Sequence, residues 1–209
     1  MIQTFSRTTV ALGWLFLTTS CYGDLVKESL KRVGTERTFA SRLVAAALER
    51  SRHSVRYDGA YVKIPYPGGD VPVATGVCTD VVIRSYRALG IDLQKEVHED
   101  MRRSFSSYPK NWGLTKPDPN IDQRRVPNLQ AFFKRKGASL PVSQVAADYR
   151  PGDLITCTVA GRLPHIAIVV PAPDGGETPW IVHNIGSGPK LENRLFEFPL
   201  TGHYRFHPE

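Results

Sequence analysis

Residues 75–90 read TGVCTDVVIRSYRALG, and this stretch decides how the chain around it is interpreted. Apolar residues recur through residues 81–89 at the spacing of one face of an α-helix. Gly90 is a natural stop after the last turn. The pattern therefore predicts a helix whose N-terminus lies at or beside Cys78. Asp80 falls in its first turn, where the helix dipole favours a carboxylate.

Cys78 has the position that a cysteine nucleophile needs. A thiol attacks as the thiolate, and a helix N-terminus lowers the thiol pKa. The free N–H groups of the same turn can receive the oxygen that becomes negative during acyl transfer. Two alternatives stay open from the residues alone. In the first alternative Cys78 is a buried apolar residue with no chemical role. In the second it is one half of a disulfide with Cys157, which an oxidising compartment would allow.

His165 is the candidate base for this thiol. It opens the alternating run HIAIVV of residues 165–170, which predicts a strand. A histidine on a rigid strand opposite a helix N-terminus can take the thiol proton. A third group must then orient the imidazole. His183, on the next predicted strand, is our choice for that role, and Asn184 is the fallback.

The remaining pattern predicts an α+β domain. Helix is expected over residues 24–55, 97–101 and 126–136, and an Asp-Gly-Gly turn at 174–176 joins two strands of a hairpin. Residues 92–137 form an excursion between the nucleophile helix and the strands. The other expected strands are residues 61–64, 153–159, 180–185 and, as an edge strand, 202–206.

Four ordered motifs resemble the NlpC-like cell-wall cysteine peptidases, which have a papain-like fold. TGVCTDVVIRSYRALGI at 75–91 resembles their nucleophile helix, and PGDLI at 151–155 resembles their Pro-Gly-Asp-Leu strand start. PHIAIVV at 164–170 and IVH at 181–183 resemble the strands of the base and of the orienting residue. The resemblance covers roughly residues 57–206. It implies a nucleophile helix packed on an antiparallel sheet, no cofactor, no metal, and hydrolysis of a peptidoglycan amide by Cys78, His165 and His183.

Other stretches depart from that superfamily. The usual Asp-Cys-Ser-Gly is Val-Cys-Thr-Asp at residues 77–80, and the excursion has no counterpart. The chain is also similar to an exported bacterial family of unknown function. That similarity rests on IPYPGGDVP at 64–72, VCTD at 77–80 and NIDQRRVPNL at 120–129. The departures keep a second hypothesis open, a catalytically inactive module that binds the wall or another partner.

The excursion carries the expected substrate-binding residues. Asp122, Arg124 and Arg125 could clamp a peptide carboxylate, because guanidinium reads carboxylate as a fork. A charged loop held by its own salt bridges is an equal alternative. Aromatic residues such as Trp112 could wall a cleft, although simple packing is the commoner role. The predicted substrate-binding set is Tyr61, Asp80, Asp122, Arg124, Arg125 and Asn184.

The N-terminus predicts export. Arg7 precedes the short apolar run of residues 10–17, and small residues follow, which is typical of a signal peptide over residues 1–23. We expect cleavage between Ser20 and Gly23, with an uncleaved anchor or lipidation of Cys21 as alternatives. Residues 24–56 would then be an N-terminal helical segment, and residues 57–209 the hydrolase domain. The expected location is the periplasm or the exterior.

The net charge of +7 suits an anionic wall polymer or membrane surface. A nucleic-acid partner is not expected, because export argues against it and no recognised motif occurs. The six histidines show no HExxH spacing and the cysteines no CxxC spacing, so no metal site is expected. The predicted partner is peptidoglycan or another peptide-containing wall polymer, bound by a monomer that meets the membrane only if Cys21 is lipidated.

Overall fold

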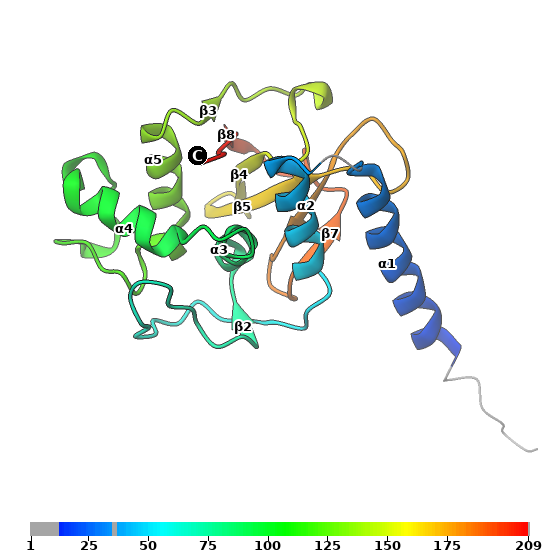
Figure 1. Ribbon diagram of the computed structural model, residues 1–209, viewed down its shortest axis with the longest axis horizontal. Coiled ribbons are helices and arrows are strands. Elements are labelled where there is room, and N and C mark those ends of the chain that lie inside the picture. The colour runs from blue at the N-terminus through cyan, green and yellow to red at the C-terminus, as the bar shows by residue number, and fades with distance from the viewer. Residues whose placement is uncertain (1–12, 35–36, 209) are drawn as a thin grey trace, which may run out of the picture.

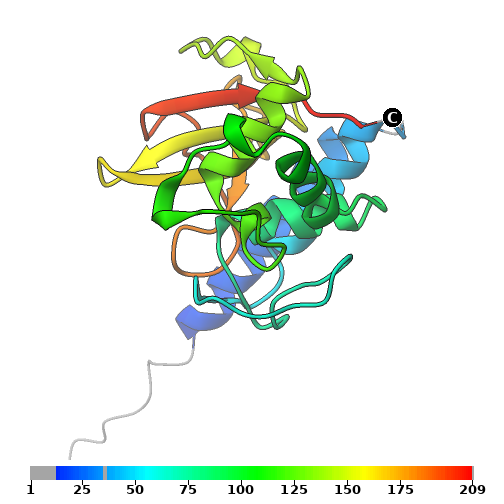
Figure 2. The same ribbon diagram turned by 90° about the vertical axis from the view of Figure 1, so that its left-hand side faces the viewer.

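The computed structural model describes residues 13–34 and 37–208, with side chains from residue 21 on. It confirms the α+β class, because helices pack on an antiparallel six-stranded sheet (Figures 1 and 2). Of the predicted signal peptide over residues 1–23, residues 1–12 lie outside the described residues, and residues 13–20 are described by their backbone alone. The helices are α1 (Gly13–Arg32), α2 (Phe39–Arg50), α3 (Cys78–Arg87), α4 (Leu93–Arg103) and α5 (Val126–Arg135), with short 3₁₀ turns at Phe105–Ser107, Asn111–Gly113, Asp122–Arg124 and Ala146–Asp148.

The sheet has the order β3-β8-β4-β5-β6-β7. Its central pair, β4 and β5, runs from Leu154 opposite Ile168 to Val159 opposite Leu163. A separate parallel pair, β1 (Arg56–Tyr57) and β2 (Thr75–Gly76), leads into α3. The strands of the large sheet are β3 (Ser139–Leu140), β4 (Leu154–Val159), β5 (Leu163–Val170), β6 (Trp180–His183), β7 (Lys190–Glu192) and β8 (Leu200–Tyr204).

The period-two pattern of β5 divides the core between the two faces of the sheet. Ile166 and Ile168 join the cluster that includes the apolar faces of α2, α3, α4 and α5. Ala167 and Val169 join a smaller cluster with Cys157 on the other face. Because both faces of the sheet are covered, the sequence of β5 is a nearly continuous apolar run. Only its first two residues, Leu163 and Pro164, are exposed.

Two strand predictions are wrong. Residues 61–64 form no strand, because the N–H of Ile64 donates to the side-chain oxygen of Asn120 (2.9 Å) and the next residue is Pro65, which has no N–H. The strand near the C-terminus is not at an edge. β8 lies between β3 and β4, since residues 139–140 pair with it after α5. A two-residue strand leaves too little pattern to be seen in a sequence.

The second half of α1 packs beside β7. The Leu191 N–H donates to the Tyr22 hydroxyl (2.7 Å), and the Ser29 hydroxyl donates to the Pro171 carbonyl (2.7 Å). Val26 between them is fully buried. The helix thus runs through the interval where cleavage was expected and joins residues 21–32 to the domain. Among the described residues, no helix has both the length and the apolar character that a membrane span requires.

Candidate active site

Cys78 is the first residue of α3, and its side chain is buried. The pairing of β5 with β6 begins only at Ile168, so the outer edge of β5 is open over its first residues. The N-terminus of α3 lies at this open edge. The Ile166 backbone N–H lies close enough to the Cys78 sulfur to lower the pKa of the thiol, and the Asn184 side chain donates to the Gly76 carbonyl (3.3 Å). The sulfur therefore lies beside the residue that follows His165.

The environment of Cys78 favours the neutral thiol. Burial raises its pKa to about 11, although backbone N–H groups of Ile166, Thr79 and Cys78 itself lower it. A buried thiolate loses the solvation that water would give it, and these N–H groups replace only part of that loss. Deprotonation at neutral pH therefore requires a neighbouring base.

His165 and His183 are joined in a relay that ends at Glu192. The His165 Nε2 lies 2.8 Å from the His183 Nδ1, and the His183 Nε2 lies 2.7 Å from the Glu192 carboxylate. Both histidines are buried. The antiparallel register explains the relay, because residues 165, 183 and 192 stand on one face of three neighbouring strands. Arg194 holds the outer end, at 3.5 Å from Glu192.

The relay determines which nitrogen of each ring carries hydrogen. A carboxylate only accepts, so His183 donates its Nε2–H to Glu192. The neutral His183 then has a bare Nδ1, which accepts the Nε2–H of His165. The bare nitrogen of His165 is consequently Nδ1, ready to take a proton. Burial, and next the nearby His183, lowers the pKa of His165 to about 3, so this base is neutral at rest.

Sequence reasoning missed Glu192 and Tyr57. Glu192 lies past the last predicted strand, and its role depends on the register of a three-residue strand, β7. Tyr57 lies in the two-residue strand β1 and lines a cavity of about 210 Å³ with Cys78. The only signal for Glu192 was an acid directly after the Lys-Leu pair of residues 190–191, which could begin another hairpin strand. The other lining residues include Trp112, Arg124, Arg125, Val126 and Pro164.

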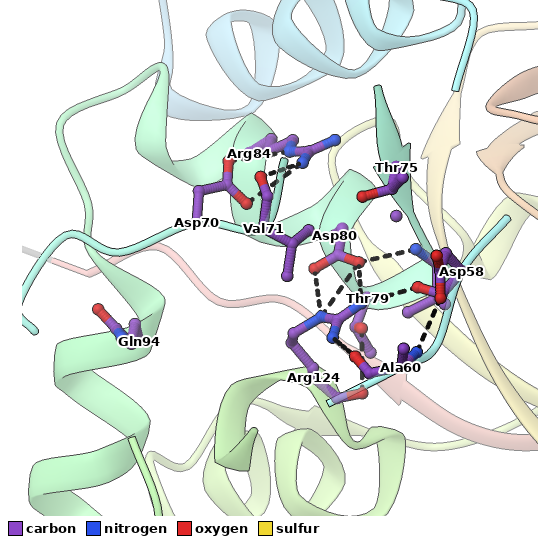
Figure 3. A network of polar contacts seen from close by, with 12 residues as sticks. Asp58, Ala60, Asp70, Val71, Thr75, Thr79, Asp80, Arg84, Gln94 and Arg124 are labelled. Atoms are coloured by element: carbon purple, nitrogen blue, oxygen red, sulfur yellow. Dashed lines mark hydrogen bonds and ion pairs between the residues drawn. The ribbon is translucent and has the colours of Figure 1, made fainter. Parts of the chain in front are cut away.

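Asp80 and Arg124 bind each other at the base of α3 (Figure 3). The Arg124 guanidinium donates to both Asp80 oxygens (3.0–3.3 Å) and to the carbonyls of Ala60 (3.1 Å) and Asp58 (3.0 Å). Asp80 also accepts from the Val77 N–H (2.7 Å), which caps the helix. Both side chains are buried and their hydrogen-bonding groups are occupied. The pair therefore positions Cys78 and has no free group for a substrate.

The other predicted binding residues are dispersed. Asp122 is fully buried against His98 (3.1 Å), and burial raises its pKa to about 6. The Tyr61 hydroxyl donates to Asp118 (2.9 Å) at the exposed edge of the excursion. Asn184 is buried beside the start of α3, as described above. Of the predicted clamp of Asp122, Arg124 and Arg125, only Arg125 is an uncommitted side chain at the cavity of Cys78.

The three cysteines of the chain are free in the structure. Cys157 pairs across the sheet with His165, and burial raises its pKa to about 12. The alternative of a disulfide between Cys78 and Cys157 is therefore not what the fold contains. In the described part of the chain, no group of three histidine, cysteine or acidic side chains could hold a metal ion.

In an enzyme that uses this relay, replacing Glu192 with Gln should reduce turnover roughly 10- to 100-fold, the usual effect of losing a carboxylate that orients a functional histidine. The amide no longer forces a hydrogen onto the His183 Nε2, so His165 loses its fixed tautomer. ¹⁵N chemical shifts of the two histidines would report that change directly. The matched control is Glu197→Gln, because Glu197 also pairs with Arg194 but touches neither relay ring. Equal turnover in the two variants would contradict the relay.

Acidification should destabilise the fold through the relay histidines. Their folded pKa values lie below the ordinary value of 6.5, that of His165 at about 3. Between these pH values the unfolded chain binds protons that the folded chain does not. The contribution of the two histidines to the free energy of unfolding is therefore complete above pH 6.5. It is lost as the pH falls toward 3, at up to about 1.4 kcal/mol per pH unit and group.

Urea unfolding from pH 4.5 to 7.5 measures this slope. The His165→Gln variant should show a shallower pH dependence than the wild type, whatever its absolute stability. His53→Gln removes a histidine from the exposed turn after α2 and serves as the control. Parallel curves for wild type and His165→Gln would show that His165 is not the source of the acid sensitivity.

Comparison with known proteins gives two matches. The family model described as "Domain of unknown function (DUF1287)" matches residues 44–206. The "Uncharacterized protein YijF" of Escherichia coli (strain K12) is 48% identical over 150 residues, which are 72% of this chain and 73% of that protein. No solved structure matches the chain. The region that the family model matches contains β1, α3, the relay of His165, His183 and Glu192, and the excursion.

Proposed function

We propose that this chain, which belongs to the DUF1287 family, is a cysteine hydrolase that cleaves an amide bond by way of Cys78. One observation carries the proposal. A buried relay from Glu192 through His183 leaves the Nδ1 of His165 bare, and the Cys78 sulfur lies near the backbone N–H of the next residue, Ile166, which lowers the thiol pKa. A polar relay buried in this way is costly unless fully satisfied, which favours a functional role.

The proposed first step is proton transfer from the Cys78 sulfur to the His165 Nδ1. The thiolate attacks the amide carbonyl carbon, and the carbonyl π electrons move to the oxygen. The backbone N–H groups of Cys78 and Thr79 at the start of α3, which face the sulfur at rest, can receive that oxyanion. His165 then gives its proton to the departing amine as the C–N bond breaks. Water, deprotonated by the same imidazole, cleaves the thioester and restores the thiol.

The alternation of side chains along β5 places His165 on the same face of the sheet as Ala167, which is the face opposite the helices. The position of the His165 ring therefore matters for the proposed proton transfer from Cys78. The sulfur lies at the open edge of β5, and an edge can be approached from either face. Direct contact between the imidazole and the sulfur is therefore a part of the proposal and not an observed hydrogen bond.

The proposed substrate is an amide of peptidoglycan stem peptides, either between stem residues or at the sugar–peptide link. Three features support it: the resemblance to the NlpC-like peptidases, the expected export and the net charge of +7, which suits an anionic polymer. The superfamily assignment and the periplasmic or secreted location belong to the same proposal.

The test is digestion of purified peptidoglycan by the purified protein, followed by mass spectrometry of released muropeptides. New free amines should appear with the wild type and not with Cys78→Ala. A slowly hydrolysed active ester should also leave an acyl group on Cys78, seen as a mass increase of the intact protein. Wall hydrolysis that persists in Cys78→Ala would refute the mechanism.

A non-catalytic wall-binding module is the second candidate, and the raised pKa of Cys78 is the observation that favours it. The wall-binding candidate predicts co-sedimentation with peptidoglycan, no released fragments and no acyl adduct on Cys78. Slow alkylation by iodoacetamide does not separate the candidates, because both leave a buried neutral thiol at rest. Adduct formation does separate them.

A further inference from the structure

Arg125 has an uncommitted guanidinium beside the nucleophile. In the described part of the chain its side chain forms no hydrogen bond or ion pair, and its Nη1 is buried without a partner. Its neighbour Arg124 is the opposite case, with donors committed to Asp80 and two carbonyls. A shielded cationic N–H without an acceptor is costly. Such a group is explained if an acceptor arrives with the ligand.

Trp112 holds this guanidinium in place. The Arg125 guanidinium carbon lies 4.1 Å from the centre of the Trp112 ring, a stacked cation–π arrangement. Stacking occupies the face of the guanidinium and leaves its edge free, which is the edge that reads a carboxylate. Trp112 is 60% exposed and has a left-handed backbone (φ 60°), which is rare for a bulky residue. Strain of this kind is found where a site needs it.

The cavity around Arg125 is suited to an anion. Its volume of about 210 Å³ has room for one amino-acid-sized group, since a water occupies roughly 30 Å³. Its lining includes no aspartate or glutamate. The charge of Arg124 is neutralised by Asp80, so Arg125 supplies the net positive charge. Cys78 lines the same cavity, so an anion bound by Arg125 would share that space with the reacting carbonyl.

We infer that Arg125 binds a carboxylate of the acyl donor, with Trp112 as the stacking support. This inference rests on the proposed function and adds its substrate class: peptides with a free carboxylate on the residue at the scissile amide or next to it. A peptide with the corresponding carboxamide would lack the anion and should be a poor substrate.

The experiment compares two synthetic glutamyl peptides that differ only by carboxylate or carboxamide at that position. The wild type should prefer the carboxylate about 10- to 100-fold in kcat/KM, mainly through KM, as a charge-assisted fork allows. Arg125→Gln should bring the ratio close to one, and Arg125→Lys should retain part of it. Arg42→Gln, at an exposed position of α2, controls for net charge and should keep the full ratio.

Calorimetry with Cys78→Ala measures binding without turnover. It therefore separates a failure of the carboxylate site from a failure of the proposed hydrolysis. Preferential binding of the carboxylate peptide that is lost in Cys78→Ala/Arg125→Gln supports the carboxylate site even if no hydrolysis is found. Equal binding of the two peptides, or equal kcat/KM in a wild type that does hydrolyse them, overturns it. Thermal melting of each variant shows whether a changed ratio comes from a folded protein.

Discussion

Removing the imidazole in His165→Ala should lower turnover at pH 7 by roughly 10²- to 10⁴-fold, the usual contribution of a group that takes the thiol proton and later protonates the leaving amine. With the Cys78 pKa at about 11, only about one thiolate in 10⁴ molecules exists at pH 7. The residual rate should therefore rise tenfold per pH unit toward pH 11. The wild type should lack this steep rise, since its base accepts the proton within the reaction step.

Rates for the active ester from pH 6 to 10, in stopped or continuous assays, give both slopes. Added imidazole should restore part of the His165→Ala rate, because the deletion opens a ring-sized space beside the relay. His53 is exposed and takes no part in the relay, so His53→Gln should behave as the wild type. A His165→Ala rate that is independent of pH, or within tenfold of the wild type at pH 7, would remove His165 from the mechanism.

The elements that sequence predicted best are those with a long local pattern. The helix from Cys78 and the strand from His165 have apolar periods that neighbouring residues alone establish. Their order, with His183 on the next strand, placed the three candidate residues on the correct elements. The short strands β1, β3 and β7 contain only two or three residues. No periodicity can be read from such lengths, so their pairing partners were missed.

The contents of the site were harder to predict because they depend on tertiary register. Glu192 joins the relay only because β7 pairs with β6 in one particular register. Arg124 and Arg125 are adjacent and chemically identical and both line the cavity of Cys78, but the Arg124 donors are committed to other groups whereas the Arg125 guanidinium has no hydrogen-bond partner among the described residues. Sequence treated them as one clamp. A buried partner, Asp80 from 44 residues earlier, separates their roles.

Replacing Arg124 with Met should destabilise the fold by about 3–5 kcal/mol, the cost of leaving a buried charge unpaired. Asp80 would lose its partner at 2% exposure, and the Ala60 and Asp58 carbonyls would lose their donors. Asp80→Asn should be similarly harmful, since it also weakens the cap of α3. Urea unfolding of each variant at pH 7.5 measures the loss.

The double variant Asp80→Asn/Arg124→Met should lose less than the sum of the single losses, because neither charge is then left alone. Arg56→Met is the matched control, because Arg56 is 72% exposed and forms a surface ion pair with Asp58. Removing an exposed pair of this kind should change the unfolding midpoint little. The two roles proposed for Arg124 have opposite signatures. A structural ion pair lowers stability and disturbs Cys78 through α3, whereas a substrate clamp would raise KM and leave the unfolding midpoint unchanged. A stable Arg124→Met variant with a raised KM would restore Arg124 to the binding site and contradict the assignment made from its contacts.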